Sequence, residues 1–328
     1  MTLILQVVGP EDPSLREAAA ILAAGGLVAF PTETVYGLGA DGLNPEAVAR
    51  IYAAKGRPAT NPVILHVADV GSARPLVAHW PEAARVLAER YWPGPLTLVL
   101  PASEVVPAIV RAGGPTVALR CPAHPVAQAL IRAVGRPLAA PSANRSQHLS
   151  PTLAEHVASS LGGAVDLILD GGATQAGLES TILDLSGTRP RLLRPGPVTP
   201  AELEALLGAV DIWEGAVQAG ARQDAPGMAE RHYAPRARLE LVAPGAGLSS
   251  ASGRVAYVGI GTLPALPAGV RGVLLPMDAK VVAARLFALL HELDDAGFTR
   301  IVMERPPSDE AWLAVRDRLQ RASVKEMA

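Results

Sequence analysis

The chain has 328 residues, of which 49% are hydrophobic and 18% charged, so it is long enough for two domains and can bury a large core. Its net charge of −2 argues against broad, non-specific binding to nucleic acids, which requires a basic surface. The single cysteine, Cys121, excludes an intrachain disulfide and a cysteine-based zinc site. The sequence shows no signal peptide and no run of 18 apolar residues, so we expect a cytoplasmic protein without membrane contact.

Strands and helices alternate through the first two thirds of the chain. The first helix is expected to begin at Asp12–Pro13 and to run to about Ala24, where two glycines end it. Thr152 and Glu155 have the spacing of a capping box for a later helix. Further helices are expected to begin near Asn44, Pro81, Pro125 and Pro200. Strands are expected at residues 27–30, 63–67, 96–100, 116–120, 138–140, 167–170, 181–185 and 191–193.

The regular pattern is lost between residues 209 and 237, which we expect to form a linker. It returns from residue 238 onwards. A strongly amphipathic helix is expected from Asp278 to Ala296, and Ser308 is expected to cap a last helix. Strands are expected at residues 255–259, 273–275 and 300–303. This β-α-β alternation predicts a small parallel sheet of Rossmann-like type, so the whole chain is predicted to have an α/β fold.

The turn after the strand at residues 27–30 contains two informative glycines. Gly37 and Gly39 allow the backbone to approach another group at a distance that a side chain would prevent. The helix that follows has Asn44 as its N-cap and Pro45 at its first position. This helix leads directly to a short segment that contains both a lysine and an arginine.

Lys55 is informative because lysine is rare in this chain. Lysine and arginine together number 29, and only Lys55, Lys280 and Lys325 are lysines. An ammonium group is a compact charge that suits a phosphate or a carboxylate, and Arg57 follows in a loop bounded by Gly and Pro. A solvated surface lysine is the plain alternative, but the two neighbouring cations favour an anion-binding site.

Further cations and hydroxyl groups are expected at strand ends and loops of the first domain. The cations are Arg120 and Arg194, and the hydroxyl groups belong to Thr32, Thr34, Thr116, Ser142, Ser150 and Ser180. Such residues just past a strand often contact ligands in α/β proteins, although a polar connecting loop would have a similar composition. Neither a Walker-A loop nor a G-x-S-x-G elbow is present. The set therefore favours polyanion binding and transfer at phosphorus over a serine hydrolase.

Four separate motifs carry a family resemblance: FPTETVYGLG at residues 30–39, KGRPATNPVILH at 55–66, APSANRS at 140–146 and PGMAERHYAP at 226–235. Together they resemble the YrdC/Sua5 family in its long, two-domain Sua5 form. The resemblance implies a YrdC-like twisted mixed sheet with helices in residues 1–208, a linker or lid at 209–237, and a smaller Sua5 C-terminal domain at 238–328. The family makes threonylcarbamoyl-AMP and pyrophosphate from L-threonine, bicarbonate and ATP, for the t6A modification of tRNA. The resemblance thus implies a nucleotidyltransferase.

The resemblance also implies roles for individual residues. Catalytic roles fall to Lys55 and Arg57, which would stabilise charge on the carbamate and the phosphates. L-threonine contacts are implied for Thr34, His66, Arg120, Ala140 (through its backbone) and Ser180. ATP contacts are implied for Arg57, Asn61, Thr116, Ser142, Asn144, Ser150, Arg194 and Tyr233. Tyr233 matches a linker tyrosine that reaches over the nucleotide, so the linker is expected to act as a lid.

Magnesium is expected to arrive with the triphosphate of ATP, because the sequence shows no carboxylate cluster for a protein-bound ion. The product is expected to pass to a tRNA threonylcarbamoyl transferase, without stable nucleic-acid binding by this chain. Two alternatives stay open at this point. One is an RNA-binding module, which would bind RNA tightly and with steep salt dependence. The other is a maturation factor that forms carbamoyl-AMP, which would be expected to carry zinc-finger cysteines and further domains.

Overall fold

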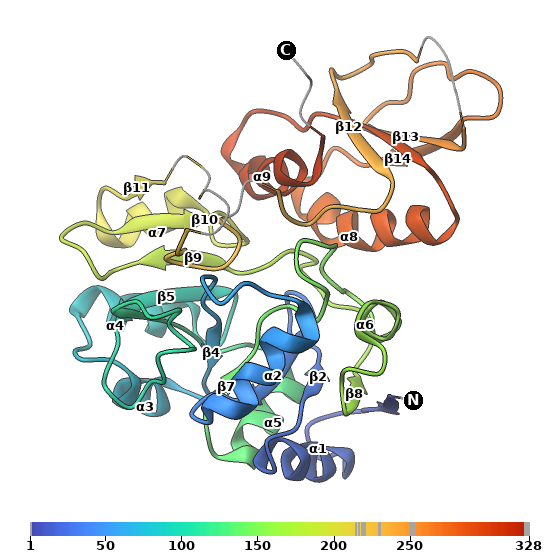
Figure 1. Cartoon of the computed structure of the whole chain (residues 1–328). Coiled ribbons are helices and arrows are strands. Elements are labelled where there is room, and N and C mark those ends of the chain that lie inside the picture. The colour runs from blue at the N-terminus through green and yellow to red at the C-terminus, as the bar shows by residue number, and fades with distance from the viewer. Residues whose placement is uncertain are drawn as a thin grey trace. The chain divides into compact units, whose positions relative to one another are not determined.

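The computed structural model describes residues 2–213, 215, 217, 221–228, 231–248 and 253–324. The chain forms two compact units, each with its own sheet (Figure 1). The first unit comprises Met1–Ser146 and Ser150–Glu230, and the second comprises Gln147–Leu149 and Arg231–Ala328. Within the described ranges, no helix combines the length and the apolar character needed to cross a membrane.

The first unit is built on one mixed sheet of eleven strands in the order β1-β8-β2-β3-β7-β4-β6-β5-β9-β10-β11. Strand β4, for example, runs parallel to β6 and antiparallel to β7. The mixed sheet predicted from the sequence is therefore confirmed. The strands are β1 (Leu3–Gln6), β2 (Val28–Phe30), β3 (Gly37–Asp41), β4 (Ile64–His66), β5 (Leu96–Pro101), β6 (Thr116–Arg120), β7 (Leu138–Ala139), β8 (Leu167–Asp170), β9 (Thr181–Asp184), β10 (Arg191–Arg194) and β11 (Asp211–Ile212).

Helix α2 shows how local sequence sets the helix ends in this unit. The side chain of Asn44 accepts hydrogen bonds from the N–H groups of Glu46 and Ala47, as the sequence predicts for an N-cap. Gly56 ends the helix in the left-handed conformation, with φ of 59°. The helices of the unit are α1 (Ser14–Ala23), α2 (Pro45–Lys55), α3 (Val70–Ala73), α4 (Glu82–Tyr91), α5 (Pro125–Val134), α6 (Ala154–Leu161) and α7 (Pro200–Leu207), with a 3₁₀ turn at Arg74–Leu76.

The capping box predicted at Thr152 and Glu155 is wrong. Helix α6 begins after Leu153, which has no side-chain cap, and Thr152 N donates instead to His156 Nδ1 (3.2 Å). His156 therefore takes the backbone N–H that Glu155 would accept from in a capping box. The described part of this unit has capping boxes at Asp69 and Ser72, at the start of α3, and at Thr199 and Glu202, at the start of α7.

The core of the first unit lies between the sheet and the neighbouring helices α1 and α5 (Figure 1). Phe30 on β2 is completely buried in this core. A Cβ atom at Gly39 on β3 would lie only 2.7 Å from the Phe30 ring, which explains the close approach predicted for this glycine. At Gly37 the nearest atom would be 3.4 Å away, so that glycine is less constrained.

The second unit contains an all-parallel sheet in the order β12-β15-β13-β14, which confirms the predicted small parallel-sheet domain. Asp278 caps α8 by accepting from the N–H groups of Lys280 and Val281. The cap predicted at Ser308 is wrong, because a 3₁₀ turn at Glu310–Trp312 precedes the last helix. The elements are β12 (Arg238–Val242), β13 (Val255–Ile260), β14 (Arg271–Leu275), α8 (Ala279–Asp295), β15 (Arg300–Glu304) and α9 (Leu313–Ala322).

Part of the segment predicted to be a linker folds onto the first unit. Gln223 N donates to Thr60 O (2.9 Å), and Ala225 and Met228 are buried. These two side chains join an apolar cluster with Ile64, Val99, Ala118, Ile182 and Leu193. Residues 214, 216, 218–220 and 229–230 of the predicted linker lie outside the described residues.

Candidate active site

The turn between β2 and β3 fixes Thr34, a predicted threonine contact. The hydroxyl oxygens of Thr32 and Thr34 lie 2.8 Å apart. Thr32 Oγ1 donates to Val35 O (2.7 Å) and accepts from the backbone N–H groups of Thr34 and Val35. These bonds close a compact turn and fix the position of Thr34, which is completely buried.

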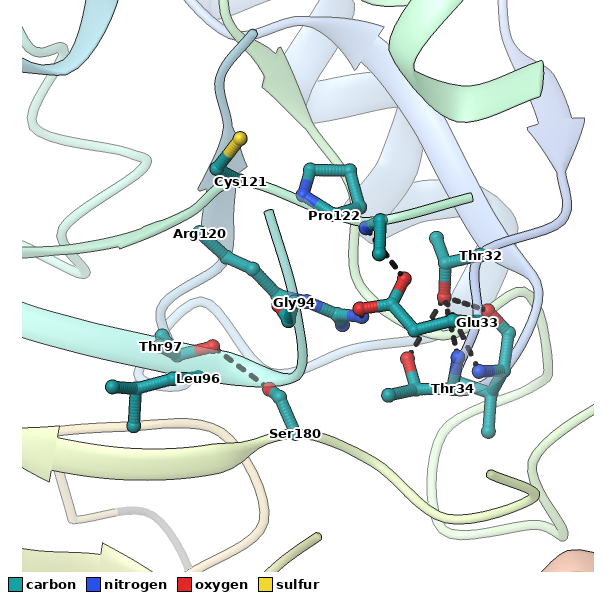
Figure 2. Close-up of polar contacts among 12 residues, drawn as sticks. Thr32, Glu33, Thr34, Gly94, Leu96, Thr97, Arg120, Cys121, Pro122 and Ser180 are labelled. Carbon is teal, nitrogen blue, oxygen red and sulfur yellow. Dashed lines mark hydrogen bonds and ion pairs between the residues drawn. The ribbon is translucent and has the colours of Figure 1, made fainter. Parts of the chain in front are cut away.

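Arg120, at the end of β6, faces the carboxylate of Glu33 from the same turn (Figure 2). Arg120 Nη2 lies 2.8 Å from Glu33 Oε1, and Arg120 Nε donates to Gly94 O (3.3 Å). Glu33 Oε2 accepts a hydrogen bond from Ala123 N (3.0 Å). Arg120 is 4% exposed and Glu33 8%, so this is a buried ion pair. Sequence reasoning missed Glu33, because no spacing in the sequence relates it to Arg120.

Strand pairing brings most of the other predicted threonine contacts to the same place. His66 lies opposite Arg120 across β4 and β6, and Thr97 lies opposite Arg120 across β5 and β6. Thr97 Oγ1 is 2.8 Å from Ser180 Oγ. Ala140 directly follows β7, which pairs with β4. His66 and Thr97 therefore flank Arg120 directly, whereas Ala140 lies two residues further along β4, where its N–H donates to Ile64 O (3.0 Å).

His66 is buried and uncharged. Burial, and then the nearby positive charge of Arg120, lowers the pKa of its imidazole to about 3. Its Nδ1 atom has no hydrogen-bond partner in the described part of the chain. The imidazole can therefore offer a neutral donor or acceptor to a ligand throughout the physiological pH range.

We expect the variant His66→Gln to lose a pH dependence of stability that the wild type shows. The unfolded imidazole takes up a proton near pH 6.5, whereas the folded state stays neutral down to about pH 3. The unfolded state thus binds more protons between these values, and stability falls as the pH is lowered through them. The expected loss between pH 7 and pH 5 is about 2 kcal/mol. Urea unfolding of both proteins at these two pH values measures it, and an equal decline in both would contradict the assignment.

Arg194, at the end of β10, links predicted nucleotide and threonine contacts. Its Nε donates to Ser180 O (3.0 Å) and its Nη2 to Ser180 Oγ (3.1 Å). Its Nη1 lies 3.5 Å from Pro226 O in the segment that follows Gln223. The guanidinium therefore joins the strand end at Ser180 to the segment at 221–228.

Lys55, the last residue of α2, is buried and fastens a predicted nucleotide loop. Its Nζ donates to the carbonyl oxygens of Ser142 and Asn144. Burial, and then the positive charge of Arg57, lowers the pKa of Lys55 well below its ordinary value, while Glu179 opposes this shift. Two of the three N–H groups of the ammonium thus donate to backbone carbonyl oxygens, which leaves the third N–H group for a ligand.

Arg57 is held by the loop that follows it. Its Nε donates to Asn61 O (3.0 Å), and its Nη2 donates to Asn61 Oδ1 and Pro62 O. Thr116 opens β6, at the opposite end of that strand from Arg120. Its hydroxyl makes no hydrogen bond to the residues that the structure describes. Thr116, a predicted nucleotide contact, is therefore separated from Arg120 by the length of this strand.

Ser150 donates a short hydrogen bond to Glu179 Oε1, and Glu179 is buried. Glu179 immediately precedes Ser180 and acts electrostatically on Lys55. The sequence assigned no role to this carboxylate. Its position at a strand end beside Ser180 was the signal that could have drawn attention to it.

Tyr233 lies in the second unit. Its ring is buried against Phe287, with centroids 5.8 Å apart, and the guanidinium of Arg318 lies 5.0 Å from the ring centre. Tyr233 also has a positive φ of 60°, a conformation that non-glycine residues seldom adopt. Its predicted contact with ATP stays a prediction.

Among the residues described here, no group of three or more His, Cys, Asp or Glu side chains is placed to hold a metal ion. Magnesium bound to the triphosphate would need no such group, since it commonly keeps several waters and phosphate oxygens as ligands. The donor set around the site is cationic and hydroxylic instead.

Two family models match this chain. The model described as "Telomere recombination", for Sua5, YciO and YrdC proteins, matches residues 20–196. The chain belongs to the Sua5/YrdC family. A second model, described as the C-terminal domain of threonylcarbamoyl-AMP synthase, matches residues 198–324 of this Sua5/YrdC member. The two models in one chain confirm the long Sua5 form expected from the motifs.

Curated relatives of this Sua5 chain carry the name threonylcarbamoyl-AMP synthase. The Pyrococcus abyssi protein is 42% identical over 342 residues, which cover 98% of both chains. The Bacillus subtilis protein is 49% identical over 231 residues, 70% of this chain and 67% of its own. The Schizosaccharomyces pombe protein is 38% identical and covers 90% of this chain and 84% of its own. These relatives give no support to the RNA-binding or carbamoyl-AMP alternatives.

Two solved structures of P. abyssi Sua5 are similar to this chain over its whole length. The complex with L-threonine has a TM-score of 0.88 and 39% identity, covering 98% of this chain and 97% of its own. A variant with an adjacent His-Tyr pair replaced by alanines has a TM-score of 0.89 and 40% identity, covering 98% and 96%. The predicted fold class is confirmed by these matches.

Proposed function

We propose that this chain is an L-threonylcarbamoyladenylate synthase. It makes threonylcarbamoyl-AMP and pyrophosphate from L-threonine, bicarbonate and ATP, for the t6A modification of tRNA. The observation that carries the proposal is the match over 98% of the chain to a Sua5 protein that was solved with L-threonine bound. The cationic and hydroxylic site of the first unit supplies the chemistry that this reaction requires.

L-threonine is proposed to bind around Arg120. The guanidinium holds the amino-acid carboxylate through charge-assisted N–H donors, which are stronger than neutral ones. The hydroxyls of Thr34 and Ser180 and the neutral imidazole of His66 add directional hydrogen bonds, and Ala140 adds a backbone contact. Because these groups are buried, an amino acid that lacks the threonine hydroxyl would leave polar atoms unpaired.

ATP is proposed to bind to the cations and polar groups on the adjoining loops. Lys55 and Arg57 stabilise negative charge on the carbamate and the phosphates, and magnesium arrives with the triphosphate as part of the substrate. Both cations are tied to backbone carbonyls, so their charges are fixed before the nucleotide arrives. The remaining proposed contacts are Asn61, Thr116, Ser142, Asn144, Ser150, Arg194 and Tyr233.

The reaction needs little covalent chemistry from the protein. The amine of L-threonine first takes up the carbon of bicarbonate as an N-carboxylate, and water is released. An oxygen of this carboxylate then attacks the α-phosphorus of ATP, and the bond to the leaving pyrophosphate breaks. Positioning and charge neutralisation dominate such transfers at phosphorus, which is the task that the fixed cations perform.

The segment at 221–228 is proposed to act as part of a lid. It lies on the first unit through the Gln223–Thr60 backbone bond, and Ala225 and Met228 are buried there. Pro226 O contacts Arg194, so the segment reaches a proposed nucleotide contact. Exclusion of water by such a lid would protect a labile mixed anhydride.

Pyrophosphate release tests the proposed function directly. We expect release from ATP and magnesium to require both bicarbonate and L-threonine when all twenty amino acids are compared. Threonylcarbamoyl-AMP should be detected by mass spectrometry in the same samples. Release without threonine, or no release with any amino acid, would contradict the proposal. The product is proposed to pass, in the cytoplasm, to a tRNA threonylcarbamoyl transferase.

A further inference from the structure

We propose that Glu33 is a positioning residue that orients Arg120 toward the carboxylate of the amino-acid substrate. The inference rests on the proposed function and adds to it a residue that acts through Arg120. It is drawn from the contacts of the buried Glu33–Arg120 pair, to which the sequence analysis assigned no role.

The guanidinium of Arg120 is fixed on two sides and open on a third. Its Nη2 meets Glu33 Oε1 at 2.8 Å, and its Nε donates to Gly94 O at 3.3 Å. Its Nη1 donates no hydrogen bond to any residue that the structure describes. A guanidinium presents five N–H groups in a rigid plane, so fixing two of its nitrogens also fixes the direction of the third.

Glu33 can hold this orientation because it is itself immobilised. Its second oxygen accepts from Ala123 N (3.0 Å), and its backbone carbonyl accepts from Ala176 N (2.8 Å). Its two neighbours in the chain, Thr32 and Thr34, are hydrogen-bonded to each other, which closes the turn around Glu33 (Figure 2). The carboxylate is therefore a fixed reference point for the arginine.

Glu33 also provides the counter-charge for a buried cation. Arg120 is 4% exposed, and no other carboxylate in the described part of the chain forms an ion pair with it. A buried charge without a partner is strongly unfavourable. Without Glu33, the guanidinium would therefore turn toward the solvent. An arginine displaced in this way could no longer present Nη1 to the substrate carboxylate.

The test compares L-threonine with L-threoninol, which has an alcohol in place of the carboxylate. Isothermal titration calorimetry measures the binding of each ligand to the full chain and to Glu33→Gln. We expect the substitution to raise the Kd of L-threonine by about tenfold or more. The Kd of L-threoninol should change by less than about twofold, because it has no carboxylate for Arg120 to bind.

A matched control is Asp41→Asn. Asp41 is also a buried carboxylate of the first unit, and it pairs with Arg136 at 2.8 Å. It lies outside the proposed site, so both Kd values should stay at those of the wild type. If Glu33→Gln does not fold, Glu33→Asp replaces it, because aspartate keeps the charge and shortens the side chain by one carbon. This variant should raise the Kd of L-threonine and leave the Kd of L-threoninol unchanged.

The outcomes separate this inference from the proposed function. A Glu33 variant that binds L-threonine as well as the wild type would overturn the role of Glu33. Equal weakening of L-threonine and L-threoninol would also overturn it, because the effect would then be a general disturbance of the pocket. Failure of the wild type to bind L-threonine or to release pyrophosphate would instead contradict the proposed function.

Discussion

Replacing Lys55 with alanine is expected to slow pyrophosphate release by about a hundredfold or more and to destabilise the fold. The ammonium is buried and donates to the carbonyl oxygens of Ser142 and Asn144. Its removal leaves one buried and one partly buried carbonyl without this donor, which costs roughly 1–3 kcal/mol for each. The unfolding free energy should therefore fall by about 2–6 kcal/mol.

The catalytic part of this effect follows from the same geometry. Ser142 and Asn144 are proposed ATP contacts, and Lys55 fixes the loop that carries them. Loss of the lysine removes a fixed positive charge and also loosens this loop, so both kcat and the KM for ATP should change. Steady-state kinetics with varied ATP, together with urea unfolding, measure the two parts separately.

Lys280→Ala is the matched control for Lys55→Ala. Lys280 is exposed in the first turn of α8 in the second unit, and it has no proposed role in the reaction. Its removal should leave both turnover and stability close to the wild-type values. Full turnover by a folded Lys55→Ala variant would exclude a catalytic role for this lysine.

Replacing Arg120 with glutamine is expected to raise the KM for L-threonine by about a hundredfold or more. The substrate carboxylate would lose its charged donor and would meet the carboxylate of Glu33 without a cation between them. The KM for ATP should change far less, because the proposed nucleotide contacts lie on other loops. Pyrophosphate release at varied threonine and at varied ATP measures the two constants.

The same substitution should also reduce stability, because it leaves Glu33 buried without its partner. Breaking a buried ion pair on one side costs roughly 3–5 kcal/mol. The double variant with Glu33→Gln should regain part of this loss, since neither charge is then left unpaired. Arg136→Gln, which removes a largely exposed arginine from Asp41, serves as the control. An unchanged KM for threonine in a folded Arg120→Gln variant would exclude the proposed carboxylate contact.

Local sequence was sufficient to predict most of the elements. Asn44, Pro45 and Gly56 define the ends of α2 through side-chain capping and backbone conformation, both of which depend on a few neighbouring residues. Asp278 defines the start of α8 in the same way. The errors at Thr152 and Ser308 have a common origin, because a local capping pattern competes with other local bonds and turns that a short motif does not reveal.

The motifs also pointed to most of the residues that the first unit brings together. His66, Arg120 and Ser180 come from separate segments, and strand pairing and the Thr97–Ser180 contact place them near one another. The turn that carries Thr34 is joined to Arg120 through Glu33. The order of the eleven strands could not be read from the sequence, since pairing between distant strands depends on the packing of the whole sheet.

By itself, the sequence determined the α/β class, the helix ends that have strong caps, and the family to which the motifs belong. These properties follow from periodicity and from short segments whose chemistry is local. Only the tertiary structure decided how the charges pair. Glu33 meets Arg120, Glu179 accepts from Ser150, and Lys55 binds carbonyl oxygens, because folding buries these groups together and each buried charge requires a partner. The partner of a buried charge is fixed by distances across the fold, which no pattern along the chain contains.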